Sequence, residues 1–168
     1  MSTLSPCSAD TETHNTPESA VPVTALLLGA GGALPFIMLA MVPLLLPATL
    51  RDPAHLALCT YAAIILSFLG GVHWGLTLAT ADARMTEHYR LRLVLSVMPS
   101  LLGWGALFLP AGWDLVTLAG AFAVMLLVDL GPGARSGAPA WYPRLRRPLS
   151  VAVVTALMMS ALFESLQT

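Results

Sequence analysis

Three long stretches without a charged side chain dominate this sequence. They lie between Glu18 and Arg51, between Asp52 and Asp82, and between Arg92 and Asp114. A helix that crosses a bilayer needs about 20 apolar residues, because the hydrocarbon core is roughly 30 Å thick and an α-helix rises about 1.5 Å per residue. Each stretch is long enough, and shorter apolar runs follow at about 113–130 and 149–166. The sequence therefore predicts an all-α, polytopic membrane bundle of five transmembrane helices, forming one domain over residues 21–168.

The composition and the amino terminus agree with a membrane protein. Charged residues make up 10% of the 168 residues, far below the roughly 25% of soluble domains. Residues 1–20 are polar, and they lack both the basic start and apolar core of a signal peptide and the arginines of a mitochondrial transit peptide. We expect a disordered tail there, followed by a retained first helix. A net charge of −1 gives no indication of a nucleic-acid partner.

The arginines predict how the chain is threaded through the bilayer. There is no lysine, and seven of the eight basic residues fall in the loops on the amino-terminal side: Arg84, Arg90, Arg92, Arg135, Arg144, Arg146 and Arg147. Only Arg51 falls on the other side. Since cytoplasmic loops of membrane proteins carry the excess of Lys and Arg, we expect a cytoplasmic N-terminus and a periplasmic C-terminus. The missing transit peptide favours a bacterial inner membrane.

The second predicted helix, about 54–80, carries a stripe of small residues at a spacing of four. The stripe contains Ala63, Ser67, Gly71 and Gly75. In lipid, small residues let two helix backbones approach closely, so that dispersion contacts hold them together. The stripe is therefore predicted to pack against another helix. The segment 149–166 has a similar ladder and is a plausible partner.

The same helix contains a histidine, His73, roughly 12 Å below the arginine-rich surface at about 1.5 Å per residue. An ionisable side chain at that depth is costly unless it is neutral, paired or hydrated. We therefore expect it to face the interior of the bundle. Three interpretations stay open: a neutral group hydrogen-bonded to another helix, a ligand-binding or proton-handling residue, and an axial haem or metal ligand. No second histidine or cysteine stands at ligand spacing to support the third.

A few polar residues at a similar depth are candidates for a pocket with His73. Ser96 and Ser100 lie on the predicted helix 91–109, Asp129 ends the fourth helix, and Arg146 follows in the next loop. Asp129 is either an ion-pair partner of a loop arginine or, with that arginine, the frame of a polar pocket. Trp74 either packs in the core or stacks on a ligand. Asp114 and Glu164 are expected to be solvated, and Cys59 to be a small core residue.

Three sequence blocks resemble a known family. They are YAAIILSFLGGVHWG at 61–75, SVMPSLLGW at 96–104 and WYPRLRRPLS at 141–150, and Asp129 lies between the last two. These residues resemble the domain-of-unknown-function 3429 family over about residues 22–166. The resemblance implies a small multi-span membrane protein without an assigned activity, and it supplies no catalytic residues.

Two functions remain open at this point. No nucleotide-binding motif, metalloprotease motif, nucleophile elbow or cysteine cluster is present, so we expect no catalytic residue, no metal and no cofactor. The leading hypothesis is a non-enzymatic accessory or assembly factor that contacts a membrane-protein partner or a second copy of itself. The alternative is a carrier or binder of a small hydrophobic or anionic ligand, such as a quinone, a lipid headgroup or a proton-coupled solute. A carrier should have a cavity beside His73, whereas a packing protein should have that space filled.

Overall fold

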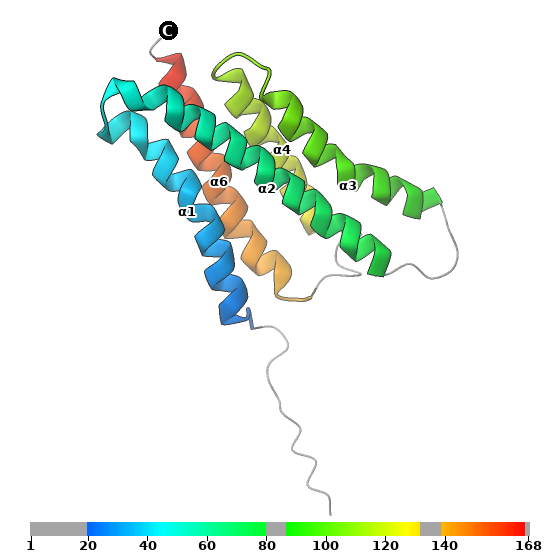
Figure 1. The fold of residues 1–168 in the computed structure, drawn as a ribbon. Helices are drawn as coiled ribbons and strands as arrows, with labels where there is room; N and C mark the ends of the chain where they lie inside the picture. Colours follow the sequence, from blue (N-terminus) through cyan, green and yellow to red (C-terminus); the bar gives the residue numbers. More distant parts are fainter. Residues whose placement is uncertain (1–19, 80–86, 132–138, 167–168) are drawn as a thin grey trace, which may run out of the picture.

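The chain folds into a bundle of long helices. A computed structural model describes residues 20–79, 87–131 and 139–166. The helices are α1 (Val23–Leu45), α2 (Arg51–Ala79), α3 (Glu87–Ala106), α4 (Trp113–Leu130) and α6 (Tyr142–Ser165), and the short 3-10 helix η1 (Ala48–Leu50) precedes α2. The described residues contain no strand, which confirms the all-α prediction (Figure 1). The predicted disordered tail lies outside the described residues except for Ala20.

Successive long helices run in opposite directions (Figure 1). Helix α2 packs against α1, α3 and α4, and α6 packs against α1 and α4. The bundle therefore has two ends. The N-terminal end holds the start of α1, the ends of α2 and α4, and the start of α6, while the C-terminal end holds the opposite ends of these helices. Gly112, with a φ of 87°, makes the tight turn into α4 at the C-terminal end.

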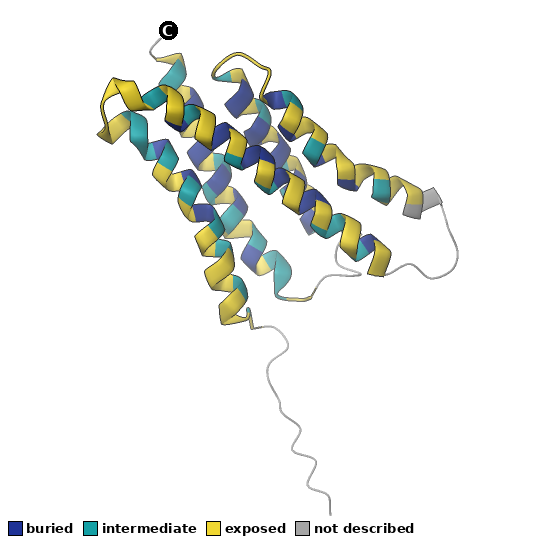
Figure 2. Cartoon of the chain, viewed as in Figure 1, coloured by how far each residue is buried: buried dark blue, intermediate teal, exposed yellow. Residues whose placement is uncertain are grey.

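Most of the outer surface of the bundle is apolar, as a lipid-facing surface must be. Leu28 is 73% exposed and Phe68 is 65% exposed, and exposed residues line the outward faces of the helices (Figure 2). Within the described residues, four segments are long and apolar enough to cross a membrane: Val23–Leu45, Ala48–Ala79, Trp113–Leu130 and Tyr142–Ser165. The protein is thus a multi-pass membrane protein. Helix α3 begins with the polar sequence EHYRLR and is not among these four segments, so the fifth span stays a prediction.

The core lies where α1, α2, α4 and α6 meet. Phe36 of α1 packs edge-on against Phe122 of α4, with ring centroids 5.6 Å apart, and against Tyr61 of α2, with centroids 5.0 Å apart. The Tyr61 hydroxyl donates a hydrogen bond to the backbone carbonyl of Gly32 at 3.0 Å. Aromatic pairs of this kind, one edge-to-face and one tilted, fix the relative rotation of helices that lipid alone would not orient.

Helix α6 begins about seven residues before the predicted start at 149. Its first residue is Tyr142, and Pro143 follows in the first turn. Proline is favoured there because its fixed φ suits a helix and its missing N–H would have no partner in any case. Arg146 was expected in a loop, but the early start places it on the rigid helix.

The predicted packing stripe on α2 divides in the structure: Ala63 lies against another helix, whereas Gly71 and Gly75 lie on the surface of the bundle. Ala63 is buried, and a Cβ built on Gly103 of α3 would lie 3.1 Å from its Cα. Gly71 and Gly75 are exposed, and a Cβ on either would meet no atom of the described residues within 4 Å. Ser67 is exposed as well, and its hydroxyl donates to its own helix at Ala63, 3.0 Å away.

Gly70 makes the close contact that the stripe was expected to make. A Cβ on Gly70 would collide with the backbone carbonyl of Ser96 on α3. The physical reason is angular: each step of four residues rotates about 40° around a helix of 3.6 residues per turn, so a stripe of that spacing turns away from its neighbour. A spacing of seven, as from Ala63 to Gly70, stays on one face.

Candidate functional site

Three charged or ionisable side chains meet near the N-terminal end of the bundle. His73 Nε2 lies 2.8 Å from Asp129 Oδ1, and Arg146 Nε donates to Asp129 Oδ2 at 2.7 Å. Each comes from a different helix: α2, α4 and α6. Asp129 is 1% exposed, so its carboxylate depends on these two partners rather than on water. A buried carboxylate held by two cationic or polar donors is the arrangement that a low-dielectric interior requires.

This cluster shows which group pairs with His73. The prediction that the imidazole faces the interior is correct, and its hydrogen-bond partner is Asp129 of α4. Ser96 instead donates within its own helix to the Leu93 carbonyl, at 2.7 Å. The proposed ion pair between Asp129 and a loop arginine is confirmed, and the arginine is Arg146. A carboxylate competes better than a hydroxyl for an imidazole because the hydrogen bond is charge-assisted.

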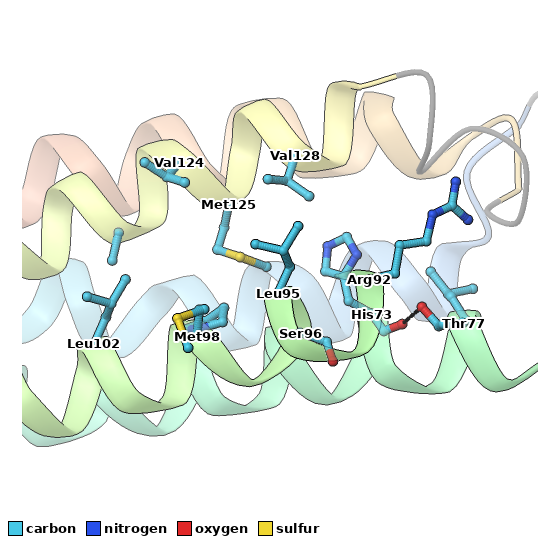
Figure 3. Close-up of a pocket in the computed structure, with 13 residues that line it drawn as sticks. His73, Thr77, Arg92, Leu95, Ser96, Met98, Leu102, Val124, Met125 and Val128 are labelled. Carbon is cyan, nitrogen blue, oxygen red and sulfur yellow. Dashed lines mark hydrogen bonds between the residues drawn. The ribbon is translucent and has the colours of Figure 1, made fainter. Parts of the chain in front are cut away.

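A cavity of about 320 Å³ lies beside His73. Its walls come from α2, α3 and α4 (Figure 3). One end is polar and holds His73, Thr77 and Arg92. The Thr77 hydroxyl donates to the His73 carbonyl at 2.8 Å, which holds this turn of α2 together. The remaining lining is mostly apolar: Leu76, Leu95, Met98, Pro99, Leu102, Ala121, Val124, Met125 and Val128.

The predicted pocket residues divide into three groups. His73 and Ser96 line the cavity. Asp129 and Arg146 do not line it, but Asp129 holds His73 from behind. Trp74 and Ser100 lie outside the lining: Trp74 is exposed, and the Ser100 hydroxyl would be 3.6 Å from a Cβ on Gly70. The sequence did not indicate three of the lining residues as pocket candidates: Thr77, Arg92 and Met125. Their side chains become neighbours only when α3 is placed against α2 and α4.

A second polar cluster lies at the C-terminal end of the bundle, between α2, α4 and α6, the three helices that also form the cluster around Asp129. His55 Nε2 is 2.6 Å from Asp114 Oδ2, and the Cys59 thiol donates to the same oxygen at 3.4 Å. On the other side of the ring, His55 Nδ1 lies 3.5 Å from Glu164 Oε1. The expectation that Asp114 is solvated is wrong: Asp114 is 6% exposed. Asp114 lies in the first turn of α4, and α2 packs over that turn. This packing removes the Asp114 carboxylate from solvent.

The sequence contained one signal for this second cluster. His55 and Cys59 are four residues apart, which places both on one face of a helix. Nothing in the sequence placed Asp114 and Glu164 beside them, since that depends on how α4 and α6 pack against α2.

Comparison with known proteins agrees with the helical, membrane-embedded structure. A family model described as "Protein of unknown function (DUF3429)" matches residues 21–162. The chain belongs to the DUF3429 family. Transmembrane protein 69 of Xenopus tropicalis is 33% identical to this DUF3429 chain over 152 residues, which cover 86% of the chain and 56% of that protein. The chain thus spans little more than half the length of this curated relative. No solved structure is significantly similar to it.

Proposed function

We propose that this DUF3429 protein binds a small amphipathic molecule in the cavity between α2, α3 and α4. The cavity itself carries the proposal. Of the two functions that the sequence leaves open, an accessory protein was expected to have this space filled, whereas a ligand-binding protein was expected to have a cavity beside His73. A volume of about 320 Å³ lies within the range of small-molecule pockets, about 300–1,000 Å³.

The lining indicates the chemistry of the ligand. Leucine, methionine and valine side chains from α3 and α4 suit an apolar body. At the polar end, the Arg92 guanidinium suits an anionic or hydrogen-bond-accepting group. Asp129 occupies Nε2 of His73, which leaves Nδ1 as the ring nitrogen that a ligand can reach. A quinone or a lipid with a small acidic headgroup has this division into an apolar body and an acceptor end.

Filling the cavity should abolish ligand binding without unfolding the protein. Val124→Trp adds a large ring to the lining of α4, and Leu127→Trp adds the same ring to an exposed position of the same helix outside the lining. We expect a quinone or a fatty acid added to the purified protein to quench its tryptophan fluorescence with saturation. The Leu127→Trp control should bind as the native protein does, and Val124→Trp should bind at least about tenfold more weakly, a loss of about 1.4 kcal/mol.

Two other results separate the chemical classes. Arg92→Gln should weaken a fatty acid more than a quinone, because only the fatty acid loses a charge-assisted hydrogen bond. Mass spectrometry of the protein purified in mild detergent should identify a copurifying molecule in the native protein and the Leu127→Trp control. Equal binding by both tryptophan variants would overturn the proposal.

We further propose that the protein lies in a bacterial inner membrane and that a ligand reaches the cavity from the cytoplasmic half of this membrane. Five of the described arginines lie toward the N-terminal end of the bundle, and Arg51 lies at the other end; this asymmetry predicts a cytoplasmic N-terminal end. A reporter fused after Thr168 should then give a periplasmic signal in a bacterial host. A fusion after Ala20 should give the cytoplasmic signal. A cytoplasmic signal from the Thr168 fusion would exclude five spans with this orientation.

A further inference from the structure

We propose that His55, Cys59 and Asp114 at the C-terminal end of the bundle bind a divalent transition-metal ion of the zinc class. Three different ligand types converge there from two helices. The distances between their ligand atoms are 2.6 Å for His55 Nε2 to Asp114 Oδ2, 3.4 Å for Cys59 Sγ to Asp114 Oδ2, and 3.6 Å for Cys59 Sγ to His55 Nε2. The site is separate from the cavity and does not depend on the function proposed for it.

These distances fit a tetrahedral zinc site with little movement. Zinc lies about 2.3 Å from a thiolate sulfur and about 2.0–2.2 Å from an imidazole nitrogen or a carboxylate oxygen. Tetrahedral angles then place the sulfur about 3.5 Å from the nitrogen and the oxygen, and the nitrogen about 3.3 Å from the oxygen. Both sulfur distances already match. Only the hydrogen-bonded pair of His55 and Asp114 must open, by roughly 0.7 Å, and side-chain rotation provides that.

The outer contacts of these ligands are those that metal sites use. Asp114 Oδ1 accepts a hydrogen bond from the Leu115 N–H at 2.7 Å, which directs Oδ2 toward His55 and Cys59. Glu164 Oε1 lies 3.5 Å from His55 Nδ1, the position of the carboxylate that orients a metal-binding histidine and raises its basicity. The two proposed ligands whose side chains must take a particular orientation, His55 and Asp114, are therefore each already oriented by a second group.

The charges balance when the ion binds. A neutral imidazole, a thiolate and a carboxylate carry two negative charges, which one divalent cation neutralises. Binding therefore breaks the S–H bond of Cys59, releases that proton to the buffer and forms a sulfur–metal bond. The N–H hydrogen of the neutral imidazole moves from Nε2 to Nδ1, on the side of Glu164, and this frees the lone pair of Nε2 for the ion. A neutral site is favourable at a mostly buried position. The thiolate selects zinc-class ions over Mg²⁺ or Ca²⁺, which prefer oxygen ligands. Water completes the coordination on the side where His55 is partly exposed.

Cobalt provides a direct test, because a thiolate bound to Co²⁺ gives a charge-transfer absorption band. The chain has only two cysteines, so in full-length Cys7→Ser protein, purified without a histidine tag, any such band must come from Cys59. We expect Co²⁺ titration to produce this band with saturation at one ion per chain. Zn²⁺ should then remove it by competition, and Mg²⁺ should not.

Substitutions of the proposed metal-binding residues test which side chains bind the ion. In the Cys7→Ser background, His55→Gln and Asp114→Asn should weaken cobalt binding by at least about 100-fold, and Glu164→Gln by about 10–100-fold with the band retained. His88→Gln is the matched histidine control and should bind as the background does. The proposal is wrong if folded Cys7→Ser protein gives no thiolate band, or if His55→Gln binds as tightly as the control. The cobalt band of the Cys7→Ser protein is measured with all proposed ligands in place. The proposal can therefore be tested even if one of the ligand variants fails to fold.

Discussion

Replacing Asp129 with asparagine should destabilise the protein more than any other single polar substitution at the N-terminal end of the bundle. Asparagine keeps the shape of aspartate but removes the charge that holds Arg146 Nε at 2.7 Å and His73 Nε2 at 2.8 Å. Breaking a buried ion pair in this way typically costs about 3–5 kcal/mol, because the remaining charge has lost its partner in a low-dielectric environment. Reversible unfolding in sodium dodecyl sulfate micelles measures this free energy.

Two controls separate the loss of the ion pair from a general effect of the substitution. Asp52→Asn makes the same change at an exposed position of α2, and we expect less than about 1 kcal/mol there. The double variant Asp129→Asn with Arg146→Gln removes both charges and should recover part of the loss, as a double-mutant cycle reports. If Asp129→Asn unfolds at the same detergent fraction as Asp52→Asn, the cluster does not stabilise the bundle.

Gly70→Leu should separate α2 from α3, while Gly71→Leu should leave them together. A Cβ on Gly70 would collide with the Ser96 carbonyl, a backbone atom that cannot rotate away. A Cβ on Gly71 would meet no atom within 4 Å in the part of the chain that the structure describes. Overpacking typically costs about 1–3 kcal/mol, and Gly70→Leu should reach at least the upper end because the obstacle is main chain. The same unfolding assay measures both variants.

The neighbouring position is a strict control for this result. Gly71→Leu should be neutral or slightly stabilising, since leucine favours a helix over glycine by somewhat less than about 1 kcal/mol. Equal destabilisation by both variants would indicate that Gly71 contacts a group outside the described residues, since a Cβ at Gly71 meets no atom of the described residues within 4 Å. A stable Gly70→Leu variant would show that α3 can move away from α2.

The helices and the inward direction of His73 were predictable because both follow from solvation. Charge-free stretches of sufficient length must be helical in lipid, and an imidazole at depth must find a polar partner. The pairing of Asp129 with an arginine was predictable in kind, since both charges lie at the same end of the bundle. The choice of Arg146 depended on the early start of α6, which a proline in its first turn permits.

The parts that sequence did not predict depend on helix rotation. Gly70 and Gly71 differ by about 100° around the axis of α2, and only the position of α3 decides which of them is in contact. Helix rotation also determines the cluster of His55, Cys59, Asp114 and Glu164, which could not be predicted because its members come from three helices that are distant in sequence. Arg92 was used to predict threading, and its place in the cavity wall depends on the packing of α3.

The two polar clusters join the same three helices at both ends, and this determines how the bundle responds to bilayer thickness. Eighteen residues separate His55 from His73 on α2, and eighteen separate Arg146 from Glu164 on α6. At about 1.5 Å per residue that is roughly 27 Å, close to the hydrocarbon thickness of about 30 Å. Helices α2, α4 and α6 therefore cannot slide past one another without breaking polar contacts at both ends. In a thinner or thicker membrane, hydrophobic mismatch must tilt these three helices as a unit or deform the surrounding lipid.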